Sequence, residues 1–459
     1  MTQRPSDDGV RAMLLTAILV LAASIAMVAA ARNTPRSVAE ASVAGFPPAL
    51  PTIAVPMPSN TTVPATAAAP SATVLALDVA SATPVPSATP APSPTASATA
   101  VAGDRVPVGT RAPAPTPLAS DTPAVPATAT ATNTPVPTPT KTMMSLRTDL
   151  PAMSLQDWPR PANDDGWGMH FIINAYPSEQ EIDLNIQRLV DMRIKWAVVI
   201  YGDEIQLQKL APRFRDAGIT VVWRRMLRPY DRYYDWGRDI AILKNLGVAP
   251  YMQAYNEPEV PAEWPDGKSN EAVFLDNLVS ACQDIYNAGG YVGLQFASSQ
   301  WLRDALHEIK ARNGQAVFGR MFFVPHSYGM NHPPDYTEDI NAVLSFRIYA
   351  MVFQQEIGMV PPMIVGEGGW KYGATDDARF PKVTDELHRD YYVALYNWFR
   401  TGKLSNGEPL PDYLFAFCPW LIAHKMDDNA FYDSFAGDRT MTIAAIKAIP
   451  PFVRHFSWG

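Results

Sequence analysis

The segment WAVVIYGDEIQLQKLAPRFRDAGITVVWRRM, residues 196–226, contains one complete strand–helix–strand unit. Trp196–Tyr201 and Thr220–Met226 are short apolar runs rich in β-branched and aromatic residues, which indicates strands. Between them, Glu204–Ala217 has apolar residues at helical spacing, and Gly218 follows as a helix stop. Two strands joined in this way predict parallel pairing, with the helix covering one face of the sheet.

The same unit recurs from Gly166 to near the C-terminus. Eight units in roughly 300 residues favour a closed barrel over an open doubly wound sheet. No G-x-G-x-x-G motif follows the first strand, which argues against a dinucleotide-binding fold. The sequence therefore predicts an α/β protein with a (β/α)8 TIM barrel over residues 157–459. The expected strands are Gly168–Ile173, Trp196–Tyr201, Thr220–Met226, Tyr251–Tyr255, Val292–Ala297, Met321–Pro325, Met363–Gly366 and Tyr413–Pro419, and the expected helices are Glu181–Met192, Glu204–Ala217, Trp236–Leu246, Glu271–Ala288, Gln300–Arg312, Ala342–Ile357, Asp385–Phe399 and Met441–Ala448.

The region before the barrel has a different composition. Half of the chain's 44 prolines lie between Arg32 and Ser145, among Ala, Thr, Ser and Val, with Phe46 as the only aromatic residue. Such a stretch cannot bury enough apolar surface to offset the entropy of folding. We therefore expect residues 32–156 to be a disordered Pro/Thr/Ala/Ser linker with polyproline II character.

The N-terminal residues 1–31 carry a targeting signal. Residues 12–31 are an uninterrupted apolar run between Arg11 and Arg32, and about 20 apolar residues can span a bilayer as a helix. The run also ends in three alanines, which suits a signal peptidase. Positive residues flank both ends, so the positive-inside rule does not decide between a cleaved signal peptide and a retained membrane anchor. Both alternatives predict export, to an extracellular or cell-surface location.

Composition also excludes some partners. The net charge is −8 and there is no basic stripe, so nucleic acid is not an expected partner. Cys282 and Cys418 belong to no CxxC or Cys/His cluster, so they predict buried apolar side chains rather than structural zinc, and a disulfide between them stays open. Only seven histidines are present, and no His-x-His motif accompanies His170 on the first strand, so we expect no metal or other cofactor.

The chemistry is expected at the C-terminal ends of the strands, where the active site of a TIM barrel lies. The fourth strand ends in Asn-Glu-Pro at residues 256–258, and the seventh leads into Glu367. The sixth ends in His-Ser-Tyr at residues 326–328, and the eighth is followed by Trp420. Because Glu257 and Glu367 lie three strands apart on one rim, we expect them to face each other across the mouth of the barrel.

Asn-Glu-Pro on the fourth strand, together with a glutamate on the seventh, resembles the clan A glycoside hydrolases, which include cellulase-like, β-mannanase-like and β-xylosidase-like barrels. The resemblance covers the barrel, from about Asp157 onward, in the order and position of the motifs. It implies an exported retaining hydrolase that cleaves β-glycosidic bonds of a poly- or oligosaccharide by double displacement. Glu257 would be the acid/base and Glu367 the nucleophile. A retaining enzyme needs these two carboxyl groups about 5–5.5 Å apart.

The resemblance also implies substrate-binding residues. By position, Asn256 would bind the sugar 2-hydroxyl, Tyr328 would donate a hydrogen bond to the nucleophile, and Trp420 would form the floor of the sugar subsite. His326 is included as a strand-end residue, with a core histidine as the alternative.

For two further residues, the place in the sequence gives weaker support for a role in the site. Trp370 is expected to stack on a sugar, as is Trp264, with packing beneath its loop as the alternative. Arg224 is included as the basic residue of an early strand, although Arg225 beside it is an equal candidate. Glu259 is expected to point away and to serve the structure.

Two other functions stay open at this stage. The first is a non-catalytic carbohydrate-binding or cell-surface protein on a degenerate barrel, because a fold alone does not give a function. The second is a metal-dependent hydrolase, which would lose activity with chelators. The sequence does not decide the sugar, the linkage, or endo against exo action.

Overall fold

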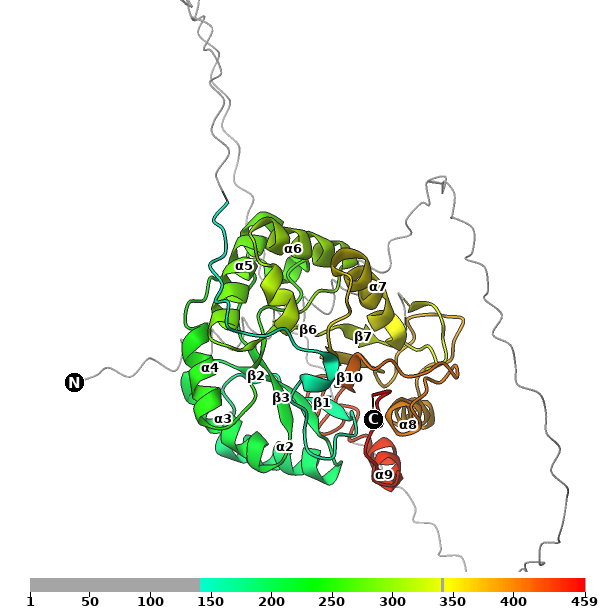
Figure 1. The fold of residues 1–459 in the computed structure, drawn as a ribbon. Coiled ribbons are helices and arrows are strands. Elements are labelled where there is room, and N and C mark those ends of the chain that lie inside the picture. The colour runs from blue at the N-terminus through cyan, green and yellow to red at the C-terminus, as the bar shows by residue number, and fades with distance from the viewer. Residues whose placement is uncertain (1–140, 340–341, 459) are drawn as a thin grey trace, which may run out of the picture. The chain divides into compact units, whose positions relative to one another are not determined.

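The computed structural model describes residues 141–339 and 342–458. Eight parallel strands form one sheet in the order β1-β2-β3-β4-β5-β6-β8-β10. A parallel bridge between Trp167 and Phe417 joins the first strand to the last, and the Phe417 N–H donates to the Gly166 carbonyl at 3.2 Å. The sheet thereby closes into a barrel, which Figure 1 shows with the helices on its outside. The predicted (β/α)8 fold is confirmed.

The predicted strands and helices are all present. Their bounds differ from the expected ones by a few residues, chiefly because several strands end early and continue as irregular backbone at the mouth of the barrel. The strands are β1 (Gly168–His170), β2 (Trp196–Tyr201), β3 (Thr220–Arg225), β4 (Tyr251–Gln253), β5 (Tyr291–Leu294), β6 (Met321–Phe323), β8 (Met363–Val365) and β10 (Leu414–Phe417). The helices are α2 (Glu179–Asp191), α3 (Glu204–Asp216), α4 (Trp236–Asn245), α5 (Glu271–Asn287), α6 (Ser299–Ala311), α7 (Phe346–Ile357), α8 (Asp385–Thr401) and α9 (Thr440–Ala448), with short 3-10 turns at Leu155–Asp157, Pro261–Glu263, Gln315–Arg320 and Val343–Ser345.

Several helices begin at polar caps that their sequences supply. Before α2, the Ser178 hydroxyl accepts from the Glu181 N–H at 3.2 Å, while the Glu181 carboxylate accepts from the Ser178 N–H at 2.8 Å. This reciprocal pair satisfies two backbone donors that the helix itself leaves unpaired. Ser298 caps α6 in a similar way through the Trp301 N–H, so the start of α6 is well defined beside the mouth of the barrel.

A second, two-stranded sheet extends the barrel at its mouth. β7 (His326–Tyr328) follows β6, and β9 (Glu367–Gly369) follows β8; they pair in parallel with His326 opposite Glu367. Between sheet and extension, the Gly366 N–H donates to the Pro325 carbonyl at 3.0 Å. The extension therefore carries His326, Tyr328 and Glu367 past the rim of the barrel while holding them in register.

The interior of the barrel is packed and closed at the end opposite the mouth. Trp158, from the segment before β1, lies 4.9 Å from the Tyr291 ring and 5.8 Å from the Tyr251 ring. Phe456, near the C-terminus, lies 5.8 Å from the Phe415 ring. These rings join an inner cluster with Trp196, Val198, Val222, Phe322, Val324, Ile364, Ala416 and Cys418. As in other TIM barrels, the inside is a core rather than a pore, so chemistry is confined to the mouth.

The two cysteines are buried and unpaired in the described structure. Burial raises the pKa of the Cys282 thiol to about 12. Both thiols therefore stay protonated at neutral pH and behave as the small apolar side chains that the sequence predicts.

The expected end of the linker at residue 156 is wrong. Met144 is buried and its N–H donates to the Arg312 carbonyl at 2.8 Å, and the Met153 N–H donates to the Gly319 carbonyl at 2.9 Å. Residues 141–156 thus run as an extended strap over α5 and α6 (Figure 1). The sequence hides this because an extended strap held by backbone bonds has no apolar period.

The rest of the expected linker and the apolar run 12–31 lie outside the described residues. Within residues 141–339 and 342–458, no helix combines the length and the apolar character that crossing a bilayer requires.

Candidate active site

Glu257 and Glu367 face each other at the mouth of the barrel. Glu257 follows β4 and Glu367 begins β9, which continues from β8. An oxygen of each carboxylate and the Nδ1 of His326 all lie within 4.8 Å of one another. The Glu367 side chain is only 9% exposed, whereas that of Glu257 is 27% exposed. One carboxylate is therefore held in the wall, and the other is more open to solvent.

Two donors hold Glu367. Arg224 Nη1 donates to its Oε1 at 2.7 Å, and the Tyr328 hydroxyl donates to its Oε2 at 2.8 Å. Burial, and then the charge on Glu367, raise the pKa of Tyr328 well above its ordinary value, so the phenol keeps the proton that it donates. Charge-assisted bonds of this kind orient a carboxylate as well as stabilise it.

His326 joins the two carboxylates. Its Nδ1 lies 2.8 Å from Glu257 Oε1 and 3.5 Å from Glu367 Oε2, and its side chain is 4% exposed. Burial opposes protonation of the ring, but the charges of Glu367 and Glu257 hold the pKa of His326 above its ordinary value. Because both neighbours are acceptors, Nδ1 carries a proton and donates it. His326 is therefore a site residue and not an isolated core histidine.

Asn256 and Trp420 border the same space. The Asn256 Oδ1 accepts from Gln253 Nε2 at 3.2 Å, which leaves its NH2 group as the donor for other partners. The Trp420 N–H donates to the Gly368 carbonyl at 3.1 Å, beside Glu367, and its indole N–H donates to Asp427 Oδ2 at 2.7 Å. The Trp420 ring is half-buried and lies 4.3 Å from the His170 ring. Asn256 directly precedes Glu257, and Trp420 is bonded to the residue after Glu367, while their contact with a sugar stays a prediction.

His170 is a buried neighbour of this space. Burial lowers the pKa of its ring to about 4, against the raising effect of the Glu367 charge. The ring is therefore neutral above that pH, and its Nδ1 lies 2.8 Å from the Phe171 carbonyl. It packs beneath Trp420 rather than adding charge to the site.

Arg224 and Arg225, between which the sequence does not decide, have separate roles. Arg224 points into the barrel mouth and pairs with Glu367. Arg225 points to the other side of β3, where its guanidinium lies 3.5 Å from Asp239 Oδ2 and 4.3 Å from the centre of the Tyr233 ring. This follows from strand geometry, because successive side chains leave a strand on opposite faces.

The prediction that Trp370 stacks on a sugar is wrong. The side chain is fully buried, its indole N–H donates to the His332 carbonyl at 2.7 Å, and its ring packs on Tyr391 and Tyr392. Trp264 is buried as well, with its N–H donating to the Pro258 carbonyl at 2.7 Å. Neither ring offers a face to a ligand, because a loop that the sequence cannot place folds over each of them.

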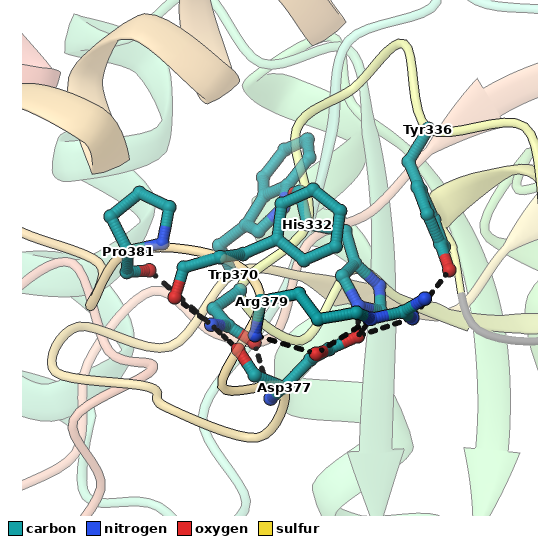
Figure 2. Close-up of polar contacts among 8 residues, drawn as sticks. His332, Tyr336, Trp370, Asp377, Arg379 and Pro381 are labelled. Atoms are coloured by element: carbon teal, nitrogen blue, oxygen red, sulfur yellow. Dashed lines mark hydrogen bonds and ion pairs between the residues drawn. The ribbon is translucent and has the colours of Figure 1, made fainter.

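Trp370 belongs to a clasp between the loops after β7 and β9, which Figure 2 shows. Asn331 Nδ2 donates to the Asp377 carbonyl at 2.8 Å, and His332 Nε2 lies 3.0 Å from Asp377 Oδ2. Arg379 pairs with Asp377 at 2.6 Å and donates to the Tyr336 hydroxyl at 3.2 Å. Chiefly through its bond to Arg379, the pKa of Asp377 is held well below its ordinary value. The clasp thus ties together the two loops that leave the site.

Sequence reasoning missed Gln295, which follows β5 and accepts from the Glu257 N–H. It also missed Asp427, the partner of the Trp420 indole. Gln295 could have been found, because it is a polar residue directly after a strand, the same signal that identifies Glu257. Asp427 carries no such signal, since it lies in the long loop after β10.

Glu257, His326 and Glu367 together have the ligand types and spacing to hold a divalent cation. The Arg224 guanidinium, 2.7 Å from Glu367, already neutralises that carboxylate and would repel a second positive charge. The charges around the two carboxylates therefore disfavour a metal ion here.

No family model and no curated protein matches this chain. Among solved structures it is similar to a family 39 glycoside hydrolase from Bacteroides cellulosilyticus, with 10% identity, a TM-score of 0.42, and coverage of 63% of this chain and 66% of that one. It is also similar to a β-glucuronidase from Ruminococcus gnavus in complex with D-glucuronic acid (9%, 0.34, 61% and 48%) and to a D-psicose 3-epimerase with D-tagatose from Clostridium cellulolyticum (10%, 0.33, 61% and 96%). The chain thus spans less than two thirds of the first two. A fold alone does not give a function, so function has to be argued from the site.

Proposed function

We propose that this chain is a retaining glycoside hydrolase that cleaves β-glycosidic bonds of a poly- or oligosaccharide, with Glu257 as acid/base and Glu367 as nucleophile. The observation that carries the proposal is the approach of the two carboxylates to within 4.8 Å across the barrel mouth. Retaining enzymes hold their carboxyl groups about 5–5.5 Å apart, and inverting enzymes about 6.5–9.5 Å apart to admit a water molecule. This close approach is compatible with the spacing of retaining enzymes, and so supports a double displacement.

In the first step, a Glu367 oxygen attacks the anomeric carbon and the bond to the leaving oxygen breaks. Glu257 gives its proton to that oxygen, so that the departing sugar leaves as a neutral alcohol. Arg224 and Tyr328, at 2.7 and 2.8 Å, hold Glu367 oriented before attack. The NH2 group of Asn256 would donate to the sugar hydroxyl next to the reacting carbon.

In the second step, water attacks the same carbon and the bond to Glu367 breaks. Glu257, now a carboxylate, takes a proton from the water, which returns the site to its starting state. His326, 2.8 Å from Glu257 Oε1, keeps that carboxylate in place while its charge changes. Trp420, half-buried beside Glu367, would support the sugar ring through both steps.

The proposal is tested with Glu257→Ala and Glu367→Ala on a panel of aryl β-glycosides. We expect turnover to fall by at least about 10³-fold in each case, since each carboxylate acts only in the transition states. Azide should rescue both variants with opposite stereochemistry, giving the β-glycosyl azide with Glu257→Ala and the α-glycosyl azide with Glu367→Ala. Glu263→Ala, which removes a carboxylate that pairs with Arg228 at 2.6 Å, is the control and should retain activity.

Three results would refute the assignment. Inverted product by NMR would exclude the double displacement. Loss of activity with a chelator would favour a metal-dependent hydrolase. Binding of oligosaccharide without turnover of any glycoside would favour a carbohydrate-binding protein on a degenerate barrel.

We further propose that the enzyme is exported through the apolar run 12–31, which lies outside the described residues, and works at the cell surface or beyond. The support is the length of that run and the alanines at its end. Cell fractionation with N-terminal sequencing of the mature chain tests this. A chain that begins near residue 32 shows cleavage, an intact chain in the membrane fraction shows an anchor, and an intact chain in the cytoplasm refutes export.

A further inference from the structure

Glu257 has an unusual backbone conformation. Its φ is +41°, in the left-handed region that residues with a side chain rarely adopt. Such a conformation is strained, and it persists only where its surroundings hold it. The Glu257 carbonyl accepts from the Val260 N–H at 2.9 Å, which closes a turn but leaves open what holds its N–H. Some other group has to fix the start of this turn.

Gln295 is that group. It follows β5, is 2% exposed, and accepts the Glu257 N–H on its Oε1. Because a backbone N–H can only donate, the oxygen end of the amide must face Glu257. The Gln295 NH2 group, in contrast, has no hydrogen-bond partner among the described residues. An unpaired buried amide is costly, and an apolar side chain of the same length would avoid that cost. The bond to Glu257 is the interaction that explains a glutamine here.

A second bond crosses the same gap in the opposite direction. Glu259, two residues after Glu257, accepts the Ser298 N–H on its Oε1, and Ser298 caps α6. The turn after β4 is thus tied to the segment after β5 at two points, one on each side of Pro258. The ties of Glu367 come from β3 and β7 instead, through Arg224 and Tyr328. Apart from His326, which lies near both, the two carboxylates are therefore positioned by separate sets of residues.

We infer that Gln295 is a positioning residue that holds Glu257 in its left-handed conformation and so aims the acid/base at the glycosidic oxygen. The inference rests on the proposed function. A misplacement of about 1 Å in a catalytic group can cost about 10²-fold in rate. Because the ties of Glu367 do not pass through Gln295, the loss of its oxygen impairs proton donation and leaves nucleophilic attack intact.

The test compares Gln295→Met with the wild type on two aryl glycosides of the same sugar. A dinitrophenyl glycoside leaves without a proton, whereas a phenyl or alkyl glycoside needs one, and kcat/KM reports the glycosylation step for both. We expect Gln295→Met to lower kcat/KM by about 10–100-fold on the poor leaving group and by less than about 3-fold on the activated one. Gln295→Glu keeps an acceptor for the Glu257 N–H and should restore part of the loss.

Gln206→Met is the matched control, since Gln206 is a buried glutamine on α3 far from the two carboxylates in the barrel topology. It should affect both substrates equally. An equal fall on both substrates with Gln295→Met, or no fall on either, would overturn the inference.

A crystal structure of Gln295→Met decides the anchoring independently of activity. We expect φ of Glu257 to leave the left-handed region, or the 256–260 turn to lose its order. An unchanged turn would refute the inference even in an active enzyme. A wild type that turns over no glycoside would refute the proposed function, whereas the crystal structure would still show whether Gln295 anchors the turn.

Discussion

Replacing Tyr328 by phenylalanine removes one hydroxyl, 2.8 Å from Glu367 Oε2, and keeps the ring. Arg224 still holds the other carboxylate oxygen at 2.7 Å, so the orientation of Glu367 is preserved. The change therefore isolates one hydrogen bond. Its effect on each step depends on how the charge of Glu367 changes in that step, because only interactions that differ between ground and transition state alter the rate.

During glycosylation, Glu367 loses its charge and the bond from Tyr328 weakens. During deglycosylation, the carboxylate departs, its charge returns and the bond strengthens. A hydrogen bond to a charged group contributes about 1.5–3 kcal/mol and a neutral one about 0.5–1.5 kcal/mol. The difference, about 1–1.5 kcal/mol, corresponds to roughly 5–13-fold in rate at about 1.4 kcal/mol per tenfold. We therefore expect Tyr328→Phe to slow deglycosylation by about that factor and not to slow the attack of Glu367 in glycosylation.

The assay uses a dinitrophenyl glycoside, for which deglycosylation limits kcat. Tyr328→Phe should lower kcat roughly 5–13-fold, lower KM with it, and enlarge the burst of released phenol as the glycosyl-enzyme accumulates. Because the pKa of Tyr328 is held well above its ordinary value, the wild-type to variant ratio should stay flat from pH 5 to 8. Tyr396→Phe, which removes a buried hydroxyl bonded to the Gly168 carbonyl at 3.0 Å, is the control. A fall in kcat/KM larger than the fall in kcat, without a burst, would refute the reasoning.

Three further predictions concern residues around the site and at the closed end of the barrel. Burial raises the pKa of Asp165 to about 7 from 3.8, so its folded state keeps a proton that the unfolded chain releases, and stability falls as pH rises through that window. Asp165→Asn keeps the acceptor for the Trp167 N–H at 2.9 Å. It should remove up to about 4 kcal/mol of the pH-dependent fall in the free energy of unfolding. Urea midpoints of the variant that change between pH 5 and pH 8 as much as those of the wild type would contradict this prediction. His326 also has a raised pKa, but it gains rather than loses a charge on protonation, and its partners attract that charge. Its contribution to folding stability is fully present below about pH 6.5 and is lost as pH rises through the pKa of the folded state. His326→Gln should therefore lower Tm more at pH 5.5 than at pH 8.5, and a constant difference would count against the bridge between the two carboxylates. Trp370→Phe should cost about 1–3 kcal/mol of stability, from a lost buried hydrogen bond and lost packing, with KM unchanged; a raised KM at unchanged Tm would instead place Trp370 in the sugar site.

The sequence predicts the fold and the pair of carboxylates for one shared reason. Each barrel strand is a short apolar run, and the polar residues that follow it lie at the mouth. This rule places Glu257 and Glu367 at the mouth, and the resemblance of the motifs suggests their roles. The rule does not predict which residues from different strands contact each other. Gln295 is visible as a strand-end residue, but its bond to Glu257 depends on how β4 and β5 are staggered in the sheet.

The paths of the loops are not predicted from the sequence. Trp370 and Trp264 follow strands seven and four, yet both are buried by loops whose paths are set by contacts far along the chain, such as the Asn331 bond to Asp377. Aromatic residues are equally suited to stacking on a sugar and to filling space beneath a loop. The extended strap at residues 141–156 was hidden for a related reason: its backbone bonds leave no pattern in the sequence, and its few buried side chains, such as Met144, follow no regular period.

The two arginines that end β3 show what separates a site from a structural cluster of the same chemistry. Arg225 lies 3.5 Å from Asp239, whose Oδ2 also accepts from the Tyr201 hydroxyl at 2.7 Å. Glu367 likewise accepts from one arginine and one tyrosine. The types of donor are the same, although Asp239 also accepts from Tyr233 and its arginine lies farther away. The larger difference is that Asp239 is fully buried behind the sheet, whereas Glu367 lies within 4.8 Å of the partly exposed Glu257. A carboxylate held by such donors can act as a nucleophile only where a substrate can reach it and where a second carboxylic acid can protonate the leaving group. Strand alternation alone decides which side each arginine takes, so a single-residue insertion in β3 should exchange their surroundings and abolish both clusters at once.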